Sequence, residues 1–109
     1  MATEDRSHLC GTLLDGRYLI RRRIGLGGTG LVFEAECVAD GGAVAVKMLQ
    51  PGYAKNRDLR RRLQRELEVA KRVSHRGIIP ILDAGTLADG SPYLVMPRMY
   101  GESLSRLLL

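Results

Sequence analysis

The chain has 109 residues, 45% of them hydrophobic, and 17 lysines and arginines against 12 aspartates and glutamates give it a net charge of +5. This length suits one small domain, and the apolar content excludes general disorder. The positive charge favours anionic partners and does not choose between nucleotides and nucleic acids.

The N-terminus and the cysteines predict a cytoplasmic location. The chain has two cysteines, Cys10 and Cys37, too few for a disulfide framework. The first ten residues are polar and charged, unlike a signal peptide, and no stretch is long enough to span a membrane. We expect residues 1–12 to be a flexible leader and residues 13–109 to form one domain.

Three short strands with tight turns are predicted after the leader. The first covers residues 17–20, the second 31–38 and the third 43–49, with Asp40-Gly41-Gly42 as a hairpin signal between the last two. In the second strand, alternation places four apolar residues on one face, namely Leu31, Phe33, Ala35 and Cys37. These strands predict an antiparallel meander.

A glycine-rich turn joins the first two strands, with the sequence Ile24-Gly25-Leu26-Gly27-Gly28-Thr29-Gly30-Leu31-Val32. Its glycines follow the G-x-G-x-x-G spacing. Glycine lacks a Cβ, so backbone N–H groups in such a loop can approach phosphate oxygens. A dinucleotide-binding fold would need a helix directly after the glycines, and a Walker loop would need Gly-Lys-Ser/Thr; neither follows. The alternative is a flexible hairpin without a ligand.

Two charged residues stand on apolar surfaces. Lys47 lies in the strand Ala43–Leu49 and shares a face with Ala45. Glu66 falls within the apolar stripe of a helix expected from residue 59 to about 73, capped by Asn56 or Asp58. Buried charges are costly unless paired, so the two are expected to meet. The alternative for each is a side chain that reaches water.

The outer face of the predicted helix is rich in arginine. Arg61, Arg65, Glu68 and Arg72 lie opposite its apolar stripe of Leu59, Leu63, Leu67, Ala70 and Val73. Such a run is usually a solvated face. No nucleic-acid-binding motif accompanies it, so we expect no nucleic-acid partner.

Two more strands are expected after the helix, at residues 78–84 and 93–96, with a turn at 88–92 between them. An irregular connector, Pro97–Gly101, leads to a helix-like segment that ends in Leu107–Leu109. The predicted fold is α+β, a five-stranded antiparallel sheet with one main helix.

Five pieces in this order resemble the N-terminal lobe of a protein kinase, specifically the bacterial serine/threonine kinases of eukaryotic type. They are the glycine turn through Val32, the strand Val44-Ala45-Val46-Lys47, Glu66 on its helix, the strand Tyr93-Leu94-Val95-Met96, and the connector. The first two together are specific. Leu14-Asp15-Gly16-Arg17-Tyr18 is also similar to this group.

The resemblance implies an ATP site. Gly25, Gly27 and Gly30 would cover the phosphates within the loop 24–32, and Lys47 would contact the α- and β-phosphates and pair with Glu66. The remaining implied roles belong to the adenine, the ribose and the apolar column of the family. Val32 and Ala45 would flank the adenine. Met96 would guard the back of the pocket, Pro97 would offer its carbonyl, and Met99 would offer its N–H and carbonyl. Glu102 or Ser103 would approach the ribose, and Ile81 and Ala70 would join the column.

The chain departs from the family pattern at the catalytic motifs. His75-Arg76 stands where the family has His-Pro. His75-Arg76-Gly77 lacks the aspartate of a catalytic loop, and Asp89-Gly90-Ser91 is a turn rather than the Asp-Phe-Gly metal site. We therefore expect the second lobe to be absent, no Mg²⁺ ligands, and no phosphoryl transfer by this chain alone.

Two rival functions remain from the sequence. A non-catalytic kinase-like module could bind a partner protein, and a nucleic-acid binder would use the arginines. Leu104 and Leu107–Leu109 suit either a second lobe or a partner, since both predict a covering surface there.

Overall fold

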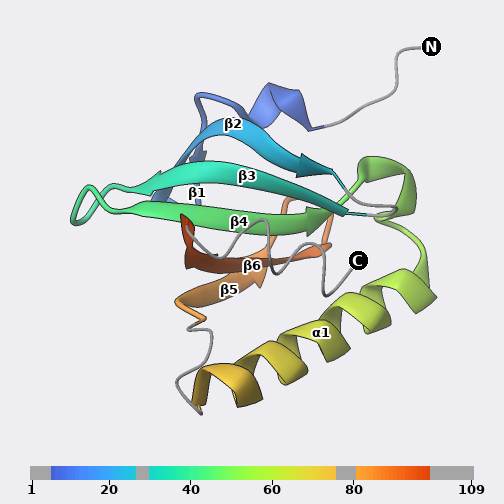
Figure 1. Cartoon of the computed structure of the whole chain (residues 1–109). Coiled ribbons are helices and arrows are strands. Elements are labelled where there is room, and N and C mark those ends of the chain that lie inside the picture. Colours follow the sequence, from blue (N-terminus) through green and yellow to red (C-terminus); the bar gives the residue numbers. More distant parts are fainter. Residues whose placement is uncertain (1–5, 27–29, 76–80, 99–109) are drawn as a thin grey trace.

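The computed structural model describes residues 6–26, 30–75 and 81–98; within the helix, the side chains of residues 66, 67, 70, 71 and 73–75 fall outside the description. The described strands form one antiparallel sheet in the order β1-β2-β3-β4-β6-β5, and α1 lies along its β5–β6 side (Figure 1). In chain order the elements are η1 (Ser7–Leu9), β1 (Leu13–Leu14), β2 (Tyr18–Leu26), β3 (Gly30–Cys37), β4 (Ala43–Leu49), η2 (Pro51–Tyr53), α1 (Arg57–His75), β5 (Asp83–Thr86) and β6 (Pro92–Pro97).

The predicted α+β architecture is confirmed, with two differences in the strands. β1 adds a short sixth strand that pairs with β2 through Leu13 and Leu14. The strand expected over 78–84 is found as β5 at Asp83–Thr86, so the predicted position is wrong at residues 81 and 82, while residues 78–80 lie outside the description. The reason is that the turn closed by the Leu87 N–H donating to the Ser91 carbonyl (2.8 Å) sets the pairing with β6.

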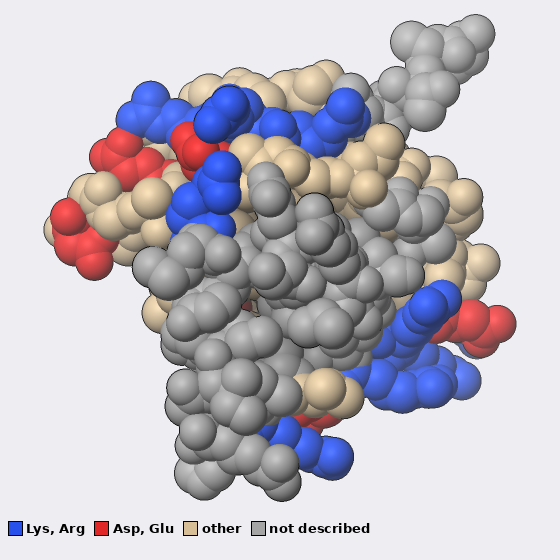
Figure 2. Space-filling view, in the orientation of Figure 1, with Lys and Arg blue, Asp and Glu red and all other residues tan. Residues whose placement is uncertain are grey.

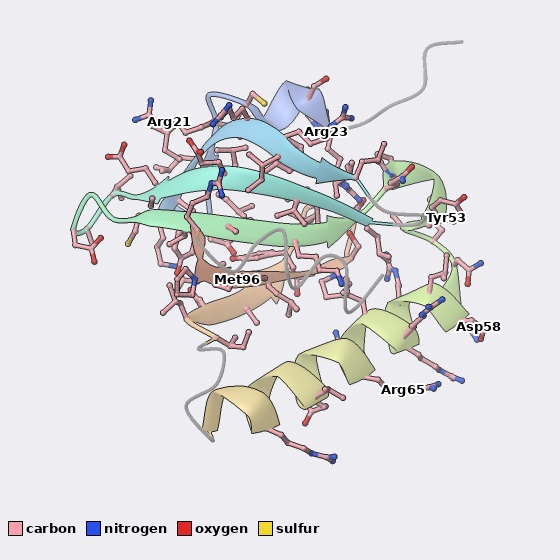
Figure 3. All side chains as sticks on the ribbon, in the orientation of Figure 1. Arg21, Arg23, Tyr53, Asp58, Arg65 and Met96 are labelled. Carbon is pink, nitrogen blue, oxygen red and sulfur yellow. The ribbon has the colours of Figure 1, made fainter. Side chains whose placement is uncertain are left out.

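Helix α1 begins at Arg57, directly after Asn56, which is one of the two predicted N-caps. The side-chain oxygen of Asn56 accepts a hydrogen bond from the Leu59 N–H at 3.1 Å, which identifies Asn56 as the cap. Leu63, from the predicted apolar stripe, is buried. The outer residues Arg61, Arg65, Glu68 and Arg72 are exposed as predicted, and Figure 3 shows Arg65 projecting away from the sheet.

Side chains on both faces of the central strands are buried. The register aligns Phe33, Val46 and Val95 in one row, and the next row along the strands aligns Val32, Lys47 and Leu94. Successive side chains of a strand point to opposite faces, so the two rows face opposite sides. The first row belongs to the larger core, which contains Tyr18, Ile20, Leu31, Phe33, Ala35, Val44, Val46, Met48, Leu87, Tyr93 and Val95. This confirms the apolar face predicted for residues 31–37, with Cys37 packed against it.

Residues 6–12 pack against the sheet, where the sequence predicts a flexible leader. The Gly11 N–H donates to the Ile20 carbonyl at 2.7 Å, and the Ile20 N–H donates to the Thr12 carbonyl at 2.9 Å. Arg6 is only 5% exposed. The Arg6 side chain reaches the Leu49 carbonyl, 43 residues away, a contact that local sequence pattern does not reveal. Residues 1–5 lie outside the description.

Two buried tyrosines connect the strands on the large-core face. The Tyr18 hydroxyl donates to Asp83 Oδ2 at 2.7 Å, and the Tyr93 hydroxyl donates to Asp15 Oδ2. Gly85 lies directly opposite Tyr93 in the β5–β6 register. A Cβ at Gly85 would lie 2.5 Å from Tyr93 Cζ, so the ring occupies the space that a side chain would need.

We expect Gly85→Ala to destabilise the fold by about 1–3 kcal/mol, because the added methyl must displace a buried ring. Urea unfolding followed by circular dichroism measures the change. Gly52→Ala is the matched control, since a Cβ there meets nothing within 4 Å. Equal stability of Gly85→Ala and the parent would contradict this packing.

A second expectation concerns alkaline pH. Burial, followed by the hydrogen bond and charge of Asp83, raises the pKa of Tyr18 to about 12. A folded-state pKa above the unfolded value of about 10 gives stability that is present below pH 10 and is lost as the pH rises toward 12. Tyr18→Phe should lower the free energy of unfolding at pH 8 by about 1 kcal/mol. Between pH 10 and 12, the free energy of unfolding of Tyr18→Phe, measured in urea, should also fall less steeply than that of the parent. Parallel curves across that window would refute the assignment.

Candidate functional site

Residues predicted from four separate segments come together on the face opposite the large core. Val32, Ala45, Leu94 and Met96 form a buried cluster, and Ile24, Ile81 and Ala84 pack against it. We call this surface, together with Lys47, the Lys47 face. β2, β3, β4 and β6 supply its predicted members, and Met96 lies on β6 (Figure 3). The sequence did not single out Leu94 or Ala84, although alternation with Met96 could have indicated Leu94.

Lys47 is fully buried in the middle of this surface. It lies directly opposite Val32 on β3 and opposite Leu94 on β6, and its side chain is 0% exposed. A buried ammonium is costly unless it is partnered. Lys47 does have an interaction partner, and among the described residues no buried side-chain nitrogen or oxygen lacks one. The structure therefore rules out the alternative of a lysine that reaches water at a sheet edge.

Glu66, the predicted partner of Lys47, lies on α1, and its side chain is among those outside the description. The Lys47–Glu66 pair therefore stays a prediction. The same holds for Ala70, the expected companion of Ile81 in an apolar column.

The glycine-rich segment is the hairpin between β2 and β3. Gly25 lies opposite Val32 and Leu26 lies opposite Leu31, with an irregular register around Ile24. Gly30 opens β3 and is buried, whereas Leu26 is 60% exposed. Gly27, Gly28 and Thr29 lie outside the description.

Leu31, a member of the predicted loop, has its side chain on the other face of the sheet. It is fully buried in the large core, while its neighbour Val32 belongs to the Lys47 face. A ligand on the Lys47 face could therefore meet Leu31 only through backbone atoms, because adjacent side chains in a strand diverge.

An ion pair that the sequence did not reveal connects β3 to the end of β6. Arg98 Nε donates to Glu34 Oε1 at 3.1 Å, and Arg22 lies 3.4 Å from the same oxygen. The hydrogen bond from Arg98 is the strongest influence on this carboxyl group. Together with Arg22 it lowers the pKa of Glu34, against the effect of partial desolvation. The pair fixes the start of the connector beside Pro97, which itself lies opposite Val44.

The rest of the predicted connector, with Met99, lies outside the description. The same holds for the segment after it, which contains Glu102, Ser103, Leu104 and Leu107–Leu109. In the part of the chain that is described, no group of His, Cys, Asp or Glu side chains could hold a metal ion. No helix within those residues is long and apolar enough to cross a membrane.

A cavity of about 610 Å³ lies away from this surface, between residues 6–15 and the turn after β5. None of its lining residues belongs to the predicted site, so we do not associate it with nucleotide binding. Figure 2 shows lysines and arginines over β2 and along α1, so the basic charge is spread over two separate regions.

Comparison with known proteins agrees with this arrangement. The model of the protein kinase domain matches residues 18–109. Serine/threonine-protein kinase PknD of Mycobacterium tuberculosis is 39% identical over 93 residues, which is 85% of this chain and 14% of the relative. A probable serine/threonine-protein kinase PknB of Corynebacterium glutamicum is 41% identical over 91 residues, 81% of this chain and 14% of the relative.

Solved structures show the same fold. The PknI kinase domain of Mycobacterium tuberculosis is 30% identical with a TM-score of 0.59, over 82% of this chain and 36% of that domain. Another kinase domain has a TM-score of 0.67 at 20% identity, over 80% of this chain and 26% of that one, a likeness of fold alone. The chain spans about 14% of the length of the curated relatives described above. Residues 18–109 belong to the protein kinase domain family and are homologous to bacterial serine/threonine-protein kinases.

Proposed function

We propose that this chain supplies the ATP-binding part of a serine/threonine protein kinase, which transfers phosphate from ATP to protein hydroxyl groups. The observation that carries the proposal is the full burial of Lys47. This lysine lies opposite Val32 on β3 and two residues from Ala45 on β4, so that it shares a face with Ala45. The bacterial relatives named above are serine/threonine kinases, and their names support the choice of substrate class.

The residues on the Lys47 face fit a nucleotide. Val32 and Ala45 are small and apolar, which suits contact with both sides of a flat base. The Lys47 ammonium suits phosphate oxygens because it is a compact cation on a flexible stem. The hairpin from Ile24 to Val32 would present backbone N–H groups to the phosphates.

The edge of the base would meet the chain at the end of β6. Met96 would close the back of the site, and Pro97 would offer only its carbonyl because proline has no N–H. Met99 would offer both its N–H and its carbonyl. Glu66 would pair with Lys47 and hold its ammonium in place for the phosphates.

The residues for the transfer step itself are not in this sequence. Phosphoryl transfer requires a carboxylate beside the acceptor hydroxyl and ligands for Mg²⁺. The sequence contains neither His-Arg-Asp nor Asp-Phe-Gly, and the described residues contain no acidic cluster that fits Mg²⁺. We therefore propose that these 109 residues bind ATP weakly and do not transfer phosphate on their own.

Substitution of Lys47 tests the binding site. We expect ATP to shift the NMR amide signals of Gly25, Val32 and Ala45 in the parent chain. Lys47→Met should weaken binding by about 10- to 100-fold, because a charge-assisted contact to phosphate is lost. Lys55→Met is the matched control, since Lys55 is exposed and lies outside the proposed site. Equal ATP affinity of Lys47→Met and the parent would exclude this role for Lys47.

A radiolabel experiment tests the proposed inactivity. The pure chain, incubated with γ-labelled ATP, Mg²⁺ and a generic protein substrate, should give no labelled protein above the level of its Lys47→Ala variant. Lysine-dependent labelling would show that the 109 residues contain a complete catalytic centre. The proposal of a non-catalytic ATP-binding part would then be wrong.

A further inference from the structure

Arg6 makes a set of contacts that the proposed nucleotide site does not explain. Its side chain is buried, although it lies seven residues before the first strand. Its Nε donates to the Leu49 carbonyl at 2.6 Å, and a terminal nitrogen donates to Asp89 Oδ2 at 2.9 Å and to Ser91 Oγ at 3.3 Å. One guanidinium group therefore joins the end of β4 to the turn between β5 and β6.

Asp89 connects this turn to a second arginine. Its carboxylate accepts hydrogen bonds from the Ser91 N–H at 2.9 Å and from Ser91 Oγ at 2.6 Å. Its backbone carbonyl accepts a hydrogen bond from Arg60 at 2.8 Å, and Arg60 lies in the first turn of α1. The turn thus lies between an arginine of the N-terminal segment and an arginine of the helix.

This arrangement stabilises the ionised form of the Asp89 carboxyl group. Burial alone would favour the neutral carboxyl group. The hydrogen bonds from Ser91 and Arg6 outweigh that effect and lower the pKa of Asp89 to about 2. The Arg6–Asp89 contact is therefore an ion pair at neutral pH, with the Arg6 side chain almost fully shielded from solvent.

Arg60 also fixes the connection that leads into the helix. Its Nε donates to the carbonyl of Ala54, a buried residue between η2 and α1. The start of α1 is thus attached both to this connection and to the β5–β6 turn. Leu49, held by Arg6, lies two residues after Lys47 on β4. The strand that carries Lys47 and the helix that carries Glu66 are both attached, through arginines, to one turn.

We propose that Arg6 is a positioning residue, which holds the β5–β6 turn so that α1 keeps the orientation in which Glu66 reaches Lys47. This inference rests on the proposed function, in which the two side chains pair to hold ATP. It gives Arg6 a role in the site through contacts with Leu49, Asp89 and Ser91.

The orientation of α1 can be measured without ATP. Spin labels at Ala39→Cys and Arg72→Cys, both exposed positions, report the distance between the β3–β4 turn and α1 in a chain with Cys10→Ser and Cys37→Ser. We expect one narrow distance distribution in pulsed electron paramagnetic resonance for the parent. Arg6→Ala should broaden or shift it. The matched control is Arg21→Ala, which removes an exposed arginine that pairs with Glu36 on the surface.

ATP affinity of the folded variants gives the second measurement. Arg6→Ala should weaken ATP binding by roughly 2- to 30-fold, a range typical of coupling through packed networks. Arg6→Ala combined with Glu66→Gln should bind no more weakly than Glu66→Gln alone, because both changes remove the same pairing. A purely structural role would lower stability and leave the ATP affinity of the folded chain unchanged.

The two measurements separate the possible failures. An unchanged α1 distribution in Arg6→Ala overturns the positioning role, whatever the ATP result. A changed distribution in a chain whose parent binds no ATP overturns the proposed function and leaves the mechanical link intact. If Arg6→Ala does not fold, Asp89→Asn is used instead. It keeps the carbonyl that binds Arg60 and removes the charge that binds Arg6, so it should change the distribution in the same direction by a smaller amount.

Discussion

The burial of Lys47 within the sheet is the constraint on which the other features depend. β4 is packed on both faces, with Val44, Val46 and Met48 in the large core and Ala45 on the opposite side. A slip of one residue against β3 would exchange these faces and place the ammonium among the side chains of the large core. The energetic cost of that arrangement would be several kcal/mol, so the lysine itself helps to fix the register of the three central strands.

Features encoded by short-range pattern could be predicted from the sequence. Alternation identified the faces of β3 and the common face of Ala45 and Lys47, and the Asp40-Gly41-Gly42 turn identified the β3–β4 hairpin. The position of β5 could not be obtained in this way. The sequence suggested a strand over residues 78–84, whereas the strand found among the described residues is Asp83–Thr86.

Contacts between residues far apart in the chain could not be predicted from local sequence pattern either. Arg6 meets partners 43, 83 and 85 residues away, and Glu34 meets Arg98 across 64 residues. Arg6 belongs to a polar segment that local pattern assigns to solvent, and Arg98 belongs to an irregular connector for which local pattern predicts no partner. Their partners are determined by the order of strands in the sheet, which brings the start of the chain to the end of β4 and the β5–β6 turn. The common face of Ala45 and Lys47 was easier to predict because both residues lie on one regular strand with a fixed period.

The packing of residues 6–17 bears on where this domain physically begins. The family match starts at Tyr18, but the folded unit extends further toward the N-terminus. A boundary drawn at residue 18 would remove β1, the hydrogen-bond partner of Tyr93 at Asp15, and the cation that neutralises Asp89. A shortened protein of that kind would expose an edge of the sheet along β2 and leave a partly buried carboxylate without its counter-ion. Homology and mechanical integrity therefore define different limits for the same domain.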